Sequence, residues 1–472
     1  MNDAAARALT RKDFGAPEPS APARIVHFGL GNFHRAHQAW FSARASDGGD
    51  WGICAFTGRG SGIAHALEPQ GGLYTLIERS ASGDRCEVMT NLVEVHEGSD
   101  TGAIINVFSR LEVVVVTTTV TEAGYRMDLD GTPHVDDVEL ARDVATLHEA
   151  LLHDHLEGIE LSTVAGRILL GLAARRRANA GPITLVPCDN LPNNAGVLRR
   201  GLTQLAQRIS AELALWLEEN VTFVSTSVDR ITPRTTENDI AMVARETGWL
   251  DAAPVVTEPF ASWVLSGHFA GGRPRWEDAG ALFVDEIEPY ERRKLWLLNG
   301  AHSILAYLGL EAGHATVAEA VADVQCRRSV VSFWSSAQRH LPDDLELEVY
   351  CRQLFERFEN SRIEYQLEQI ASDSVMKLRT RIAPVIVAEF RAGRDCPAGV
   401  EVVAAWVRRI LARGSFPDAQ ILAISSLLDN APAAVVELIR LVDAQLVDLG
   451  TFVEQVQRLV TDHPDSARTL HT

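Results

Sequence analysis

Lys294, Asn299 and His302 interrupt a mostly apolar segment, KLWLLNGAHSILAYLG. At 100° per residue, Lys294, His302 and Asn299 project at about 0°, 80° and 140° around an α-helix, which places all three on one side. Polar groups in such surroundings need hydrogen-bond partners or a cleft. The segment is therefore either a core helix with a few interfacial polar residues or the chemical centre of an enzyme.

The chemistry that suits these residues is the oxidation of an alcohol. An ordinary lysine has a pKa of about 10.4. Burial and a nearby positively charged nicotinamide would both lower the pKa of Lys294, which would make it a usable base. Asn299 could then donate a hydrogen bond to the developing alkoxide, and His302 could orient a substrate hydroxyl. Glu291, one turn before the lysine, could pass the proton towards solvent.

A second candidate site is the glycine turn GLGNFH, residues 29–34, between a predicted strand at 24–28 and a predicted helix. In a dinucleotide-binding fold such a turn brings backbone N–H groups close to a pyrophosphate, with His34 at the start of the helix. The pattern is GxGxxH in place of GxGxxG. An ordinary strand-to-helix turn with two glycines fits this pattern as well.

The end of the next predicted strand bears on coenzyme choice. An acidic residue there usually holds the adenosine ribose of NAD. Here the sequence is Phe56-Thr57-Gly58-Arg59-Gly60, without Asp or Glu. Arg59 could stack on adenine, meet a 2′-phosphate or lie at the surface, so NAD and NADP both stay open. His34 and His37 are spaced for a metal, but no ligand set accompanies them, and no metal is expected.

The elements that must position these residues change in character along the chain. Strands are predicted at 24–28, 51–58, 73–79, 86–95, 111–121, 183–190 and 221–228, and helices at 137–153, 163–178 and 194–218. Alternating strands and helices indicate a mostly parallel sheet covered on both faces. After Pro289 only amphipathic helical patterns follow. The expected fold is an α/β domain, 1–284, that binds a dinucleotide, followed by an all-helical substrate and catalytic domain, 285–472.

The bulk composition narrows the possible partners and location. The chain has 472 residues and a net charge of −19, which repels nucleic acids and anionic membranes. Its six cysteines show no CxxC spacing and are expected to be reduced. No segment is apolar enough for a signal peptide or a membrane span. We therefore expect a cytoplasmic protein with a small-molecule substrate and no nucleic-acid or membrane partner, either a monomer or a weak homo-oligomer.

Five motifs in one order resemble the polyol-specific long-chain dehydrogenases, the mannitol dehydrogenase family. They are GLGNFHRAHQAWF from residue 29, TVTEAGY at 119–125, CDNLPNN at 188–194, VDRITPR at 228–234 and KLWLLNGAH at 294–302. The resemblance runs from about residue 24 to beyond 380. It implies a Rossmann-type N-terminal domain, a helical C-terminal domain and an active site between them that needs no metal.

The resemblance also implies residue roles. Lys294 matches the catalytic lysine, Asn190 and Asn299 match the two asparagines that hold the oxyanion, His302 matches the substrate-positioning histidine, and Glu291 matches the proton-relay glutamate. Substrate contacts are implied for Asp229, His302 and Lys377. The residues expected at the coenzyme are Gly29, Gly31, Asn32, Phe33, His34, Arg35, Arg59, Thr121 and Asp229.

One region departs from the family. Residues 369–379, QIASDSVMKLR, lack the family's Gly and Pro there, and Gln369 stands where mannitol 2-dehydrogenases have an arginine. The leading expectation is interconversion of mannitol or a related polyol with its ketose, with NAD or NADP. The alternatives are a sugar-acid reductase that acts on fructuronate, which would want Arg379 or Arg381 as a second cation, an enzyme for sugar phosphates, and a non-catalytic dinucleotide sensor.

Overall fold

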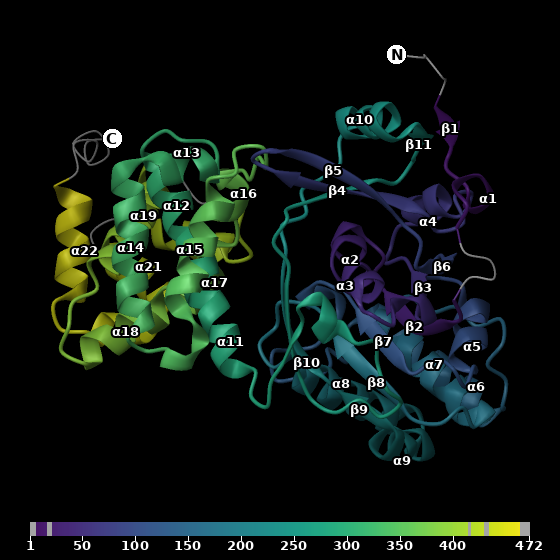
Figure 1. Cartoon of the computed structure of the whole chain (residues 1–472). Coiled ribbons are helices and arrows are strands. Elements are labelled where there is room, and N and C mark those ends of the chain that lie inside the picture. The colour runs from purple at the N-terminus through teal and green to yellow at the C-terminus, as the bar shows by residue number, and fades with distance from the viewer. Residues whose placement is uncertain (1–5, 17–20, 414–416, 429–433, 463–472) are drawn as a thin grey trace. The chain divides into compact units, whose positions relative to one another are not determined.

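The computed structural model describes residues 6–16, 21–413, 417–428 and 434–462. The chain divides into two compact units, Met1–Glu288 and Pro289–Thr472 (Figure 1). Among the helices that the structure describes, none combines the length and the hydropathy needed to cross a bilayer.

The main sheet of the first unit has six parallel strands in the order β6-β3-β2-β7-β8-β9. Their bounds are β2 (Ala23–Phe28), β3 (Gly52–Phe56), β6 (Leu92–His96), β7 (Val115–Thr118), β8 (Ile183–Pro187) and β9 (Val221–Phe223). Counted along this sheet, the order is 3-2-1-4-5-6, the Rossmann order, and it reverses between β2 and β7. The predicted parallel Rossmann-type sheet is confirmed.

The strands of this sheet are buried on both faces. In β3, Ile53 and Ala55 pack into one apolar core, while Cys54 and Phe56 pack into another. This alternation follows from the two-residue period of a strand. The helices of the unit are α2 (Asn32–Ala36), α3 (Gln38–Arg44), α4 (Gly62–Leu67), α5 (Thr101–Phe108), α6 (Val138–Leu152), α7 (Val164–Ala178), α8 (Asn194–Ile209), α9 (Ala211–Asn220) and α10 (Glu237–Thr247).

Smaller elements complete the first unit. Strand β4 (Tyr74–Ser80) lies between β12 (Val255–Thr257) and β5 (Gly83–Met89), and β10 (Ser225–Asp229), β13 (Ser262–Ser266) and β14 (Leu282–Phe283) form another sheet. A short pair joins β1 (Arg7–Ala8) to β11 (Trp249–Leu250), and α1 (Arg11–Phe14) follows β1.

Four predicted elements differ from the structure. The strand expected at 86–95 is interrupted at Thr90 and Asn91, and its two parts, β5 and β6, belong to different sheets. The strand expected at 111–121 is reduced to β7, because the chain turns at Leu111, whose side chain is 72% exposed. The strand expected at 221–228 is split into β9 and β10, which belong to different sheets. The helix expected at 194–218 is two helices, because Ser210 has an extended backbone and its side chain caps α9. Tertiary packing decides where a strand ends or changes sheet, and a local pattern does not report this, whereas the Ser210 cap is a local signal.

The second unit is helical, as predicted, and no strand occurs among its described residues. Its helices are α11 (Glu288–Arg293), α12 (Gly300–Glu311), α13 (Val317–Ala322), α14 (Val324–Gln338), α15 (Leu347–Phe358), α16 (Leu367–Ala371), α17 (Ser374–Arg381), α18 (Ala383–Arg391), α19 (Pro397–Arg413), α20 (Ile421–Leu428), α21 (Ala434–Val442) and α22 (Phe452–Thr461). A π-helical turn, Lys294–Asn299, joins α11 to α12. One large apolar core spans these helices.

A buried carboxylate ties α18 to its surroundings. The side chain of Glu389 is fully buried and accepts hydrogen bonds from Arg339, from His340 at 2.7 Å and from Arg394 at 2.8 Å. Burial by itself raises the pKa of Glu389, but the hydrogen bonds from Arg339, Arg394 and His340 outweigh it and lower the pKa to about 2. Glu389 thus stays ionised although its side chain is buried.

We expect Glu389→Gln to lower the free energy of unfolding by roughly 3 kcal/mol, because it removes a buried charge and leaves its cationic partners uncompensated. Glu437→Gln, which breaks an exposed pair with Arg440, should cost less than about 1 kcal/mol. Since folding depresses the pKa of Glu389, its stabilising contribution is present above pH about 4.5 and is lost as the pH falls towards 2. Denaturant unfolding of both variants between pH 3 and 7 measures this, and equal losses would contradict it.

Candidate functional site

The glycine turn follows β2, at the point where the strand order reverses. Its two glycines differ in whether the fold requires them. Gly29 has a φ of +103°, and a Cβ atom there would overlap the backbone oxygen of Thr119, which follows β7. Gly31 has an extended backbone, and a Cβ there would meet only the oxygen of Gly29 at 3.6 Å. The fold therefore requires Gly29 but not Gly31. The open space at Gly31 fits the close approach of a pyrophosphate.

Hydrogen bonds from neighbouring side chains hold the glycine turn in place. The Thr119 hydroxyl donates to the oxygen of Gly29 at 2.8 Å. Arg35, only 2% exposed, donates to the oxygens of Gly31 at 3.2 Å and Ala253, and to Oδ1 of Asn32 at 2.8 Å. The structure thus gives Arg35 a role in holding the turn. Thr119 lies inside a motif used for the resemblance, but its bond to the turn could not be read from the sequence.

Two histidines lie stacked beneath the turn. The rings of His27 and His34 are 3.3 Å apart, and both side chains are fully buried. Burial lowers the pKa of His27 to about 3, and burial together with His27 holds the pKa of His34 well below its ordinary value. Both rings are therefore neutral. His34, expected near the pyrophosphate, supplies no positive charge and no exposed ring there.

The other residues expected at the coenzyme lie beside the carboxyl ends of the parallel strands. Arg59, after β3, and Thr121, after β7, are exposed. Phe33 is partly buried, with its ring 4.9 Å from that of His37. The imidazole of His37 bonds the backbone oxygen of Ser262 at 2.8 Å, so its Nε2 is the donor.

The segment after β8 carries Asn190, which is exposed. Asp189 accepts the backbone N–H of Leu191 at 2.9 Å and so turns the chain. Asn194, buried at the start of α8, donates to the oxygens of Pro187 at 3.2 Å and Thr226 at 3.0 Å and accepts from the N–H of Thr226. Asn194 therefore fixes this loop to β10, a role that the sequence did not reveal.

Asp229 lies at the end of β10 and is partly buried. It precedes Arg230, whose buried guanidinium donates to the backbone oxygens of Ala36 at 2.6 Å and Glu258 at 2.9 Å. The first unit thus presents Asn190 and Asp229 on segments that are each anchored by a neighbouring side chain.

In the second unit, the predicted α-helix geometry is wrong between Lys294 and Asn299. This segment is π-helical, and the N–H of Gly300 reaches back to the oxygen of Leu295, five residues earlier. Residues five apart are therefore about one turn apart, so Lys294 and Asn299 lie on nearly the same face instead of 140° apart. His302, three residues after Asn299 in α12, adjoins it on that face. Such π-helical turns are frequent at functional sites.

The remaining predicted residues of this unit surround the same helix or lie on α16 and α17. His302 is 7% exposed, and its ring lies 4.9 Å from that of Phe358 and 5.3 Å from that of Tyr365. Glu291 lies on α11, three residues before Lys294. The Lys377 ammonium donates to the oxygen of Ile370 at 3.0 Å, which ties α17 to α16.

The two arginines considered for a substrate carboxylate differ in position. Arg379 donates to the oxygens of Val442 at 2.7 Å and Leu441 at 2.6 Å, at the end of α21, and so has a structural role. Arg381 lies beside the catalytic candidates, with Nη1 3.4 Å from the backbone oxygen of Asn299 and 3.4 Å from the hydroxyl of Ser303.

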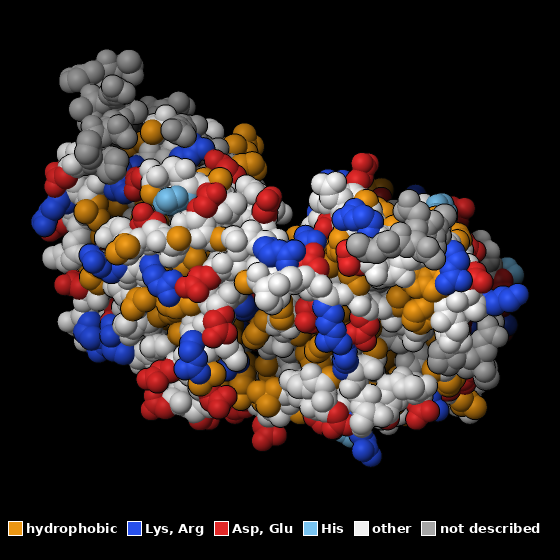
Figure 2. Space-filling view, turned by 45° about the horizontal axis from the view of Figure 1, so that its top comes forward, with side chains coloured by type: hydrophobic (Ala, Val, Ile, Leu, Met, Phe, Trp, Pro, Cys, Tyr) orange, Lys and Arg blue, Asp and Glu red, His pale blue; other side chains and the backbone are white. Residues whose placement is uncertain are grey.

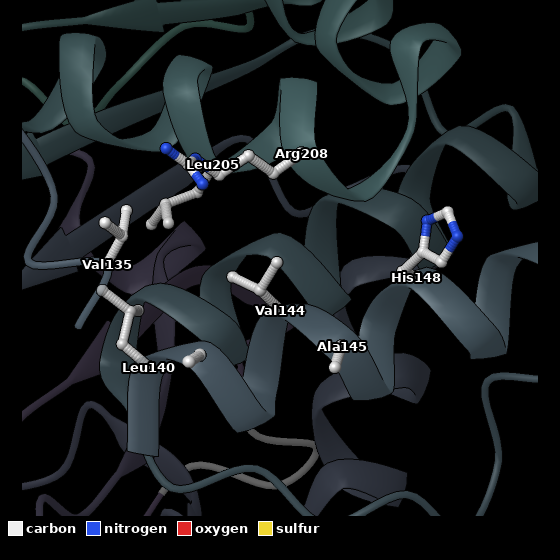
Figure 3. A pocket seen from close by; sticks show the side chains of 8 residues that line it. Val135, Leu140, Val144, Ala145, His148, Leu205 and Arg208 are labelled. Atoms are coloured by element: carbon white, nitrogen blue, oxygen red, sulfur yellow. The ribbon is translucent and has the colours of Figure 1, made fainter. Parts of the chain in front are cut away.

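Other candidate sites lie elsewhere in the first unit. Figure 3 shows a pocket lined mainly by apolar side chains of α6 and α8, with Arg208 and His148 among them. Cys54, Glu94 and His96 form a group with metal-ligand chemistry, but Arg110 already binds Glu94, with Nη2 3.0 Å from Oε2. On the face shown in Figure 2, acidic and basic side chains are interspersed.

Comparison with known proteins gives matches along nearly the whole chain. Residues 23–278 match the mannitol dehydrogenase Rossmann domain, and residues 286–457 match the mannitol dehydrogenase C-terminal domain. The D-mannonate oxidoreductase of Escherichia coli K12 is 34% identical, over 82% of this chain and 79% of its own length. The D-arabinitol 4-dehydrogenase of Ralstonia nicotianae is 35% identical, over 83% and 84%.

A solved structure also matches both units. The mannitol 2-dehydrogenase of Pseudomonas fluorescens, in ternary complex with NAD and D-mannitol, superposes with a TM-score of 0.80 and 29% identity. The match covers 98% of each chain.

Proposed function

Because the chain belongs to the mannitol dehydrogenase family, we propose that it is a metal-independent oxidoreductase that interconverts a polyol and its ketose, with Lys294 as the general base. The observation that carries this proposal is the π-helical turn, which brings Lys294 and Asn299 to nearly one face beside His302. In this proposal residues 1–284 hold the coenzyme and residues 285–472 supply the base.

The chain's own groups have defined tasks in polyol oxidation. Lys294 Nζ accepts the hydroxyl proton, and the amides of Asn299 and Asn190 donate hydrogen bonds to the oxygen as its charge develops. His302 orients the hydroxyl, and Glu291 passes the proton from Lys294 to solvent. The glycine turn at Gly29 and Gly31 would hold NAD, which would supply the acceptor for the hydride that leaves the carbon bearing this oxygen. One alcohol and one NAD⁺ thus give one ketone, one NADH and one proton.

The glycine turn supports a dinucleotide in this role. Its position at the reversal of strand order is where ligands of such sheets bind. Gly31 leaves space that the fold itself does not require, while Arg59 and Thr121 are exposed at strand ends. The mannitol 2-dehydrogenase of Pseudomonas fluorescens was solved with NAD, which makes NAD the first coenzyme to test.

A second candidate function is the reduction of a sugar acid such as fructuronate. The observation that favours it is the position of Arg381, whose guanidinium lies beside Asn299 and Ser303. A guanidinium there suits a carboxylate, which prefers bidentate charged donors. The 34% identity to a D-mannonate oxidoreductase is compatible with this alternative.

A substrate panel tests both functions. Mannitol, arabinitol and mannonate are offered with NAD⁺ and with NADP⁺, and fructose and fructuronate with the reduced coenzymes. If the chain is a polyol dehydrogenase, we expect turnover of a polyol. If it is a sugar-acid reductase, we expect turnover of mannonate and fructuronate, and Arg381→Gln should raise the KM for the acid at least about tenfold. Tight coenzyme binding without turnover of any member would instead identify a dinucleotide sensor.

A further inference from the structure

The backbone of the π-helical turn receives a hydrogen bond from another helix. The carbonyl of Leu297 accepts the indole N–H of Trp334 at 2.8 Å, and both residues are buried. The N–H of Gly300 also bonds this carbonyl, three residues back, as well as that of Leu295. In an α-helix, the N–H of Gly300 would instead bond the carbonyl of Trp296, four residues back. Trp334 therefore contacts the backbone where the α-helical pattern is interrupted.

The neighbour of Trp334 on α14 contacts the end of the same turn. A Cβ atom at Gly300 would lie 2.8 Å from Cε1 of Phe333, closer than side chains pack. Helix α14 thus approaches the backbone of Gly300 with Phe333 and bonds the carbonyl of Leu297 with Trp334. Two adjacent aromatic residues fix the segment between Lys294 and His302.

We infer that Trp334 is a positioning residue: its indole N–H stabilises the π-helical turn and thereby keeps Lys294 and Asn299 on one face. Without this donor, the buried carbonyl of Leu297 loses a hydrogen bond that the π-helical turn has and an ordinary α-helical turn does not need, so the α-helical turn becomes more favourable relative to it. That change would rotate Asn299 away from Lys294, towards the 140° separation of an α-helix. This inference rests on the proposed function, since it explains how the base and the oxyanion donor are aligned.

The test removes the N–H and keeps the ring. Trp334→Phe is compared with Trp406→Phe, because Trp406 is fully buried in the same unit and its indole nitrogen has no hydrogen-bond partner among the described residues. Replacing Trp334 with benzothienylalanine, which has sulfur in place of N–H, preserves the ring size. We expect kcat of both Trp334 variants to fall roughly 10- to 100-fold relative to Trp406→Phe. The coenzyme Kd should stay within about twofold, because the glycine turn is untouched. The substrate KM should change less than kcat, because Asn299 acts on the charge that develops during the reaction.

Hydrogen exchange gives a readout that needs no substrate. Amides of residues 294–302 should exchange faster in both Trp334 variants than in Trp406→Phe. Equal kcat and equal exchange in the benzothienylalanine and Trp406→Phe proteins would overturn the inference, even if Trp334→Phe failed to fold. A wild-type protein without turnover on the whole panel would refute the proposed function, while the exchange comparison would still decide whether Trp334 holds the turn.

Discussion

Replacing Lys294 with alanine is expected to lower kcat for polyol oxidation by about 10³-fold, since the hydroxyl proton would lose its acceptor. Coenzyme affinity should change little, because the glycine turn proposed to hold the pyrophosphate is unaltered. Lys294→Arg should be equally inactive, because a guanidinium keeps the charge but does not give up its proton at working pH. Steady-state kinetics and coenzyme titration measure both effects.

The control for Lys294 is Lys12→Ala, a change of an exposed lysine on α1, which should leave kcat unaltered. The chain contains only three lysines, Lys12, Lys294 and Lys377, so amine labelling followed by mass spectrometry can titrate Lys294 separately. Because only the unprotonated amine accepts a proton, kcat for oxidation should fall as the pH drops in parallel with the labelling rate. Near wild-type kcat in Lys294→Ala across the pH range would show that another group is the base.

Replacing Gly29 with alanine should destabilise the first unit by about 3 kcal/mol or more. The new Cβ would combine a strained positive φ with overlap of the Thr119 backbone, which cannot move aside as a side chain can. Denaturant unfolding, followed by hydrogen exchange in peptides of the first unit, measures the loss.

Gly31→Ala is the matched control and should behave differently. Its backbone is compatible with alanine, so the free energy of unfolding should change by less than about 0.5 kcal/mol. The methyl group would instead occupy the space proposed for the pyrophosphate, and the Kd for NADH should rise at least about tenfold. Equal stability of the two variants would contradict the steric argument. Normal NADH binding by Gly31→Ala would show that the pyrophosphate does not bind against Gly31.

Much of this architecture could be predicted from the sequence because its signals are local. The β-branched runs, the glycine turn and the helical periodicity after Pro289 each report on nearby residues, and the structure bears out the fold class they predict. The hydrogen bonds that hold the functional segments in place are not local. Asn194 bonds Thr226, Thr119 bonds Gly29, and Trp334 bonds Leu297, each across more than 30 residues of chain.

The π-helical turn illustrates the same limit at the chemical centre. Its apolar pattern, KLWLLN, is equally compatible with an α-helix, so the angular positions calculated for an α-helix misplaced Asn299 relative to Lys294. The contact that distinguishes the two geometries comes from α14, more than 30 residues later in the chain. Residue types therefore identified the chemistry, whereas tertiary packing set its geometry.

The π-helical turn also changes how the spacing between base and oxyanion donor is compared among proteins. In an α-helix, residues four apart lie about 40° from each other, so a chain one residue shorter here would still align the two groups. Four residues separate Lys294 from Asn299 because the π-helical turn contains one residue more than an α-helical turn would. The reaction itself does not require this number of intervening residues. A relative with three intervening residues and an unbroken α-helix would be chemically equivalent, and a search by fixed spacing would overlook it.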